Sequence, residues 1–188
     1  MRTLIYTLII LTGWNNGVTT QENRPAFISE LTEIMNNMKT YTLEVGEAMP
    51  ADKYAYQPMD SVMSFLEQLA HLDWILHFHT YFLLENHPLT ADTYQEQLSR
   101  YSEKTAGLSK EALLKLTAKQ FDTTIGAISR LTAQRLDEAY TFSFLPGAPT
   151  RSIRVICQTI RDHVTHHRAQ MVVYLRLNGI KPPAYRLF

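Results

Sequence analysis

Two histidines four residues apart, His163 and His167, are the side chains whose type and spacing best suit chemistry in this chain. On an α-helix, residues four apart share one face, with Cβ atoms roughly 5–6 Å apart. Both imidazoles can therefore reach one divalent ion, because metal–nitrogen bonds to histidine are about 2.0–2.1 Å long. The spacing alone is a weak signal for a metal site, and packed or surface histidines are the alternative interpretation.

The histidine pair continues the apolar face of the last predicted helix. The inward stripe of that helix advances in steps of three and four residues, and its members are Ile153, Ile156, Ile160, His163, His167, Gln170 and Tyr174. The stripe is aliphatic as far as Ile160 and becomes polar at His163 without a change of phase. Because buried polar groups are unfavourable unless they are paired, the stripe predicts a partner such as a metal ion.

The third ligand of such an ion must come from another part of the chain. His71 lies midway along the second predicted helix, at the edge of its apolar face, and His77 and His79 are alternatives in the same segment. His166 points about 100° away from His167 around the helix, so we expect it to be exposed or to lie behind the ligands. Spacing alone leaves the choice among these histidines open.

A reaction at the site needs a proton acceptor or donor as well as an ion. Glu67 and Tyr174 are the candidate catalytic residues, with a solvated carboxylate and a packed aromatic ring as their alternative interpretations. Gln170 is a candidate for orienting a ligand from behind. The spacing of the pair resembles the H-E-x-x-H motif of zinc proteases, but Val164 stands where that motif has its glutamate, so we exclude a metalloprotease.

Apolar residues recurring at intervals of three and four predict four long helices. These helices cover about residues 26–47, 61–86, 109–131 and 152–178, and a short polar helix is predicted at 90–103. The predicted N-caps are Ser61 for the second helix, Ser109 for the third, and Thr150 or Ser152 for the last. Gly179 follows the last helix as its predicted C′ residue, and residues 141–144 alternate like a short extended segment.

Four amphipathic helices around one core predict an all-α fold, a four-helix bundle. The connection between the second and third long helices has about 20 residues, which is long for an up-down-up-down bundle. We therefore expect a long crossover connection.

The first twenty residues differ in character from the rest. Arg2 precedes a short apolar run from Leu4 to Leu11, and small polar residues follow. This layout predicts a signal peptide at residues 1–20, a domain at 21–188, and a periplasmic or secreted protein. A cytoplasmic protein is the alternative, because no A-x-A cleavage pattern is present. The run is too short to span a bilayer, so no stable membrane anchor is expected.

Charge and cysteine content exclude further classes of protein. Lys plus Arg and Asp plus Glu number 18 each, so the chain is formally neutral and lacks the basic footprint of a nucleic-acid-binding protein. The single cysteine, Cys157, excludes an intramolecular disulfide and is predicted to lie in the core, since isoleucines surround it in the sequence. Arg168 and Arg176 are predicted to lie on the surface, with binding of an anionic substrate as the alternative interpretation.

The segments around these histidines resemble the signature of the DinB superfamily. The C-terminal stretches that carry the resemblance are DHVTHHRAQ at 162–170, YLR at 174–176 and GIKPP at 179–183. SVMSFLEQLAHL at 61–72 resembles the second-helix motif of the family. The resemblance covers about residues 25–185, and Ala169 stands where a glycine is commoner in the family.

This resemblance implies a four-helix bundle with a crossover topology and frequent homodimers. It also implies a divalent ion, zinc or nickel, held by three histidines with open coordination positions. Mapped onto this chain, the ligands are His71, His163 and His167, and only this mapping selects His71. Characterised relatives include metal-dependent thiol transferases and isomerases that use low-molecular-weight thiols. Export would conflict with thiol transfer, because those thiols are cytoplasmic.

A structural zinc site is normally closed by four protein ligands, and no persuasive fourth ligand is evident in the sequence. We therefore predict a divalent-metal-dependent enzyme of the hydrolase or thiol transferase type that acts on a small-molecule substrate. The alternative is a non-catalytic, metal-binding helical bundle that acts as a binding or stress-related module.

Overall fold

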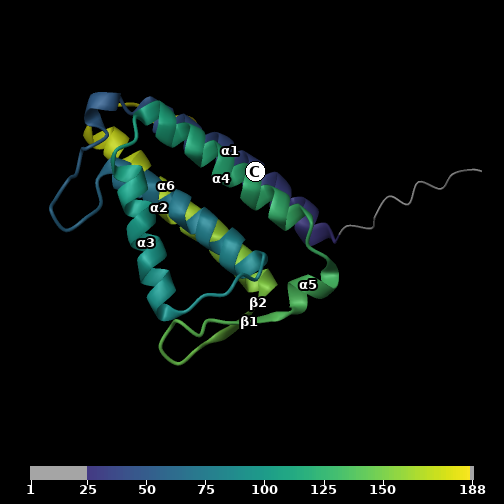
Figure 1. Cartoon of the computed structure of the whole chain (residues 1–188). Helices are drawn as coiled ribbons and strands as arrows, with labels where there is room; N and C mark the ends of the chain where they lie inside the picture. Colours follow the sequence, from purple (N-terminus) through teal and green to yellow (C-terminus); the bar gives the residue numbers. More distant parts are fainter. Residues whose placement is uncertain (1–24, 187–188) are drawn as a thin grey trace, which may run out of the picture.

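The computed structural model describes residues 25–186, so the predicted signal peptide lies outside the described residues. The described chain is mostly helical (Figure 1). In chain order its elements are α1 (Ala26–Ala48), η1 (Ala51–Lys53), α2 (Phe65–Phe78), η2 (His79–Leu84), α3 (Ala91–Ala106), α4 (Lys110–Ser129), α5 (Ala133–Asp137), β1 (Ala139–Thr141), β2 (Thr150–Ser152) and α6 (Ile153–Leu177). η1 is a 3₁₀ turn, and η2 continues α2 as a π-helical turn. Among these residues, no helix is long and apolar enough to cross a membrane.

The long helices α1, α2, α4 and α6 each pack against two of the others. α1 contacts α4 and α6, and α2 contacts the same two helices from the other side. Figure 1 shows α1 beside α4 and α2 beside α6. The principal packing therefore joins helices that are not consecutive in the sequence.

The direction of α4 explains the long connection before it. The Thr117 hydroxyl lies 3.0 Å from a carboxyl oxygen of Asp73, and the hydroxyls of Thr80 and Thr124 lie 2.7 Å apart. Residues further along α4 thus contact residues further along α2 and η2, so the two helices run parallel. Residues 85–109, which include α3, carry the chain back to the start of α4.

α2 and α6 run antiparallel, which brings the middle of each helix together. Gln68, near the start of α2, contacts Tyr174 near the end of α6, whereas His71 faces His163 one turn further along α2. This packing places the histidines of both helices at one level of the fold.

The core lies between the long helices. Among its largest fully buried side chains are Trp74 and Phe65 from α2, Phe121 from α4 and Met35 from α1. Cys157 on α6 is also fully buried, as predicted, and burial raises the pKa of its thiol to about 12.

Helix ends follow the local capping chemistry. The Ser109 and Ser152 side chains cap α4 and α6, and Gly179 has the predicted left-handed conformation with φ +71°. The prediction that Ser61 caps the second helix is wrong. Ser64 is the cap, because its side chain accepts a bond from the Glu67 backbone N–H while the Glu67 carboxylate accepts one from the Ser64 N–H.

α6 buries two faces because it packs against both α1 and α2. The prediction that Arg168 lies on the surface is therefore wrong. Arg168 faces α1, is 6% exposed, and holds its guanidinium carbon 4.8 Å from the centre of the Tyr41 ring. Arg176 is exposed, as predicted.

The segment before α6 contains more regular structure than predicted. The extended segment expected at 141–144 begins earlier, as β1, which pairs antiparallel with β2 across a turn. Gly147 in this turn has φ +76°. The short helix α5 was not predicted; its N-cap is Thr132.

Candidate metal centre

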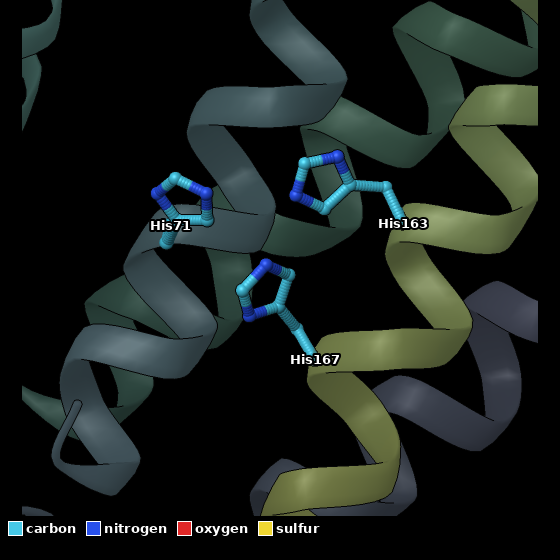
Figure 2. A group of neighbouring side chains, drawn as sticks. All are labelled: His71, His163 and His167. Carbon is cyan, nitrogen blue, oxygen red and sulfur yellow. The ribbon is translucent and has the colours of Figure 1, made fainter. Parts of the chain in front are cut away.

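His71 from α2 and His163 and His167 from α6 point toward one another (Figure 2). One ring nitrogen of each lies within 4.8 Å of those of the other two. The ring centres of His71 and His167 are 4.7 Å apart, and those of His163 and His167 are 4.9 Å apart. Tetrahedral coordination with bonds of about 2.0–2.1 Å needs nitrogens about 3.3 Å apart. Small side-chain rotations would therefore bring the three ring nitrogens close enough to coordinate one ion.

Burial and mutual repulsion keep these three histidines neutral. Burial is the main cause that lowers the pKa of each, and neighbouring histidines lower it further. The pKa falls to about 4 for His163 and to about 3 for His167. Because a histidine binds a metal ion only when its ligating nitrogen is unprotonated, the trio is ready to coordinate at neutral pH.

A buried glutamine fixes the orientation of His167. The Nδ1–H of His167 donates to Oε1 of Gln68 across 2.6 Å, which leaves Nε2 as the nitrogen with a free lone pair. Gln68, only 1% exposed, donates in turn to Gln170 Oε1 at 2.8 Å, and Gln170 Nε2 lies 2.9 Å from His166 Nε2. Such partners fix the tautomer of a ligating histidine and raise its affinity for metal.

Sequence reasoning placed Gln170 and His166 behind the ligands but missed Gln68. The structure places Gln170 and His166 in this chain of hydrogen bonds, with His166 exposed. The available signal was the spacing of Gln68 and His71, since residues three apart on a helix share a face.

The two candidate catalytic residues have different surroundings. Glu67 caps α2 through one carboxylate oxygen, 2.7 Å from the Ser64 backbone nitrogen, and borders a pocket. Tyr174 is 4% exposed; its hydroxyl donates to the Met63 carbonyl at 2.8 Å and lies 3.4 Å from Gln68 Nε2. The hydroxyl of Tyr174 thus ties the loop before α2 to α6.

The alternative histidines of the second helix lie outside the trio. His77 stacks on Tyr101, with ring centres 5.7 Å apart. His79 is buried and donates through Nδ1–H to the Ile75 carbonyl at 2.8 Å. Its burial lowers its pKa to about 4.

A pocket of about 500 Å³ opens beside the trio, between α2, the loop at 57–63 and α3. His71 forms part of its wall, together with Glu67, Trp74 and Tyr101, whereas His163 and His167 do not line it. A ligand in this pocket would therefore approach the trio from the side of His71.

The sequence profile of the DinB superfamily matches residues 36–171, a span that contains all three histidines. The chain belongs to the DinB superfamily. The resemblance seen in the sequence is thereby confirmed.

Two comparisons with a single bacterial protein agree with this membership. The uncharacterized protein YjoA of Bacillus subtilis is 24% identical over 142 residues, which cover 75% of this chain and 84% of YjoA. The crystal structure of YjoA, described as a DinB-like protein at 2.30 Å resolution, superposes with a TM-score of 0.62. That alignment covers 83% of this chain and 96% of YjoA at 19% identity, and it shows a shared fold.

Proposed function

We propose that this chain binds a divalent metal ion, zinc or nickel, through His71, His163 and His167. We further propose that it is a metal-dependent enzyme of the hydrolase or thiol transferase type. The observation that carries both proposals is the convergence of three ring nitrogens within 4.8 Å from two antiparallel helices. Three protein ligands leave a coordination position open, which is the pattern of catalytic rather than structural zinc sites. When bound, the ion supplies Lewis acidity, which activates water for hydrolysis or ionises a thiol.

The arrangement of the long helices as a four-helix bundle is part of this proposal. The four long helices would form the DinB-like four-helix bundle, with residues 85–109 as its crossover connection. Export and homodimerisation stay predictions, the first from the N-terminal segment and the second from the family resemblance.

The residues around the trio have distinct tasks in the proposed reaction. Gln68 holds His167 in the tautomer that presents Nε2. Glu67 borders the pocket and is the proposed residue for taking or giving a proton there. Trp74 and Leu66 line the same pocket, so we expect a substrate with an apolar portion beside its reacting group.

Elemental mass spectrometry of the purified protein tests the metal site. We expect about one equivalent of zinc or nickel per chain in the parent, and a loss of most of it in His71→Ala, His163→Ala and His167→Ala. His87→Ala is the matched control, because His87 lies outside the trio, where it stacks on Tyr81 with ring centres 3.8 Å apart. Absence of metal from the parent, even after reconstitution, would overturn the proposal.

The metal-loaded protein can then be screened with esters and with low-molecular-weight thiols. Glu67→Gln is the informative variant, because a glutamine amide oxygen can still accept the Ser64 N–H while it no longer takes a proton. If Glu67 acts as the general base, kcat falls by about 10²–10⁴ while metal content and Tm stay at the parent values. No turnover in the metal-loaded parent across both substrate classes would favour the non-catalytic binding module.

A further inference from the structure

A second pocket, of about 220 Å³, lies between α1 and α6. It opens on the face of α6 that packs against α1, whereas His163 and His167 face α2. The polar residues that line it are Asn37 and Tyr41 from α1, Arg161, Thr165 and Arg168 from α6, and Tyr185 and Arg186 from the C-terminal segment.

Arg168 is the buried charge of this pocket. It is 6% exposed, and its Nη1 has no hydrogen-bond partner among residues 25–186. The Tyr41 ring compensates part of the charge through its face, at 4.8 Å. A buried guanidinium without an anionic partner is nevertheless costly, because desolvation of the charge is not repaid by an ion pair.

The charges around Arg168 do not supply that partner. Arg161 and Arg186 line the same pocket, and no acidic side chain does so among the described residues. Arg186 makes a two-pronged ion pair with Glu44 of α1, which accounts for its own charge. Arg161 lies 3.4 Å from Asp162, an exposed neighbour that contributes little.

We propose that this pocket binds a phosphate group, with Arg168 as its principal ligand. A guanidinium presents N–H donors in a planar fork that matches an oxyanion with two parallel hydrogen bonds. Arg168, without an ion-pair partner, and Arg161, with only a weak exposed one, bring two guanidinium groups to the pocket, which suits a phosphate that carries up to two charges. The hydroxyls of Tyr41 and Thr165 add neutral donors to the same wall.

The size of the pocket leaves two sources for the phosphate group. A volume of 220 Å³ equals the share of about seven liquid waters, so inorganic phosphate or a small phosphate monoester would fit. The proposal does not depend on the metal site, because the two sites use opposite faces of α6.

Isothermal titration calorimetry of the full chain at low ionic strength tests the site. Inorganic phosphate and glycerol 3-phosphate are titrated separately, with acetate as the comparison anion. Saturable binding of either phosphate, tighter than that of acetate, is expected, and the tighter of the two identifies the source. No binding of either compound, or equal binding of acetate, would overturn the proposal.

Variants locate the binding. Arg168→Met, which keeps an unbranched side chain but removes the guanidinium, is expected to weaken phosphate binding about tenfold or more. Arg161→Gln weakens it too and serves as the second variant, because an exposed residue can be changed without unfolding the protein. Arg176→Gln is the matched control on the same helix and keeps the parent affinity.

Phosphate could also coordinate an ion at the histidine trio, so His163→Ala is titrated alongside. Binding that survives in His163→Ala and weakens in Arg168→Met supports the pocket between α1 and α6. Binding that is lost in His163→Ala, or unchanged in both arginine variants, would overturn it.

Discussion

The hydrogen bond from His167 to Gln68 gives the sharpest test of how the trio is organised. Gln68→Leu removes the acceptor 2.6 Å from His167 Nδ1 and replaces it with an apolar side chain of similar size. All three histidines stay in place, so the change acts on metal binding through the orientation and tautomer of one ligand. We expect metal affinity to fall by about 10–100-fold, the usual effect of losing such a partner.

That loss corresponds to about 1.4–2.7 kcal/mol of binding free energy. A separate effect falls on the metal-free protein, because His167 Nδ1–H and Gln170 Oε1 are left unpaired next to a buried side chain. Unpaired buried groups destabilise a fold by about 1–3 kcal/mol each. Partial exposure of Gln170 limits its share.

Zinc affinity can be measured by competition with a chromophoric chelator, and the stability of the metal-free protein by urea denaturation. Gln120→Leu is the matched control, because Gln120 on α4 donates to the Tyr101 hydroxyl at 3.0 Å and is not hydrogen-bonded to any of the three histidines. Gln68→Glu keeps the acceptor oxygen and should retain the parent affinity. An unchanged affinity in Gln68→Leu, or an equal loss in Gln120→Leu, would refute the role of Gln68.

Three further predictions concern stability. Burial raises the pKa of Asp73 well above its usual value, so the unfolded chain loses this proton at a lower pH than the folded chain does. As the pH rises from 3.9 to the raised pKa, the free energy of unfolding therefore falls by about 1.4 kcal/mol per pH unit. Asp73→Asn should remove that slope in urea denaturation at pH 5 and pH 8, and an identical slope would contradict it. His79 has the opposite effect on the pH dependence of stability, because burial lowers its pKa to about 4. As the pH falls below 6.5 the unfolded histidine gains its proton first, so the folded state loses up to about 3 kcal/mol of stability towards pH 4. His79→Gln should remove the His79 share of this acid destabilisation, while His163 and His167 keep theirs, which acid titration of the circular dichroism signal would show. Ser64→Ala should cost about 0.5–2 kcal/mol in thermal unfolding and Ser61→Ala almost nothing, since only Ser64 caps α2; equal effects would count against the assigned cap.

Much of the helical framework follows from the sequence because its signals are local. The apolar period predicts α1 to within a residue, and the caps at Ser109 and Ser152 are side-chain bonds to backbone groups three residues away. The miss at Ser61 has a local cause as well. Ser64 and Glu67 form the S-x-x-E pattern of a capping box, a stronger signal than the isolated serine at 61.

The remaining features depend on packing between distant segments. Arg168 is buried because α6 meets α1 on one face and α2 on another, and a single stripe of inward residues describes only one of these faces. Gln68 and His167 are 99 positions apart, so their hydrogen bond cannot be read from spacing. The choice of His71 over His77 and His79 also needed the family resemblance, which the convergence of His71 with the α6 pair supports.

The placement of the trio on α2 and α6 has a consequence for the biogenesis of the protein. His71 and His163 are separated by 92 positions (163 − 71), and α6 is the last helix within residues 25–186. During synthesis the histidine of α2 has no partner in the trio until α6 has left the ribosome. An ion bound by the trio would then link an early and a late segment of the chain, and it would bind after the two segments have packed together. Metal loading would therefore report that α2 and α6 have packed together, in whichever compartment folding ends.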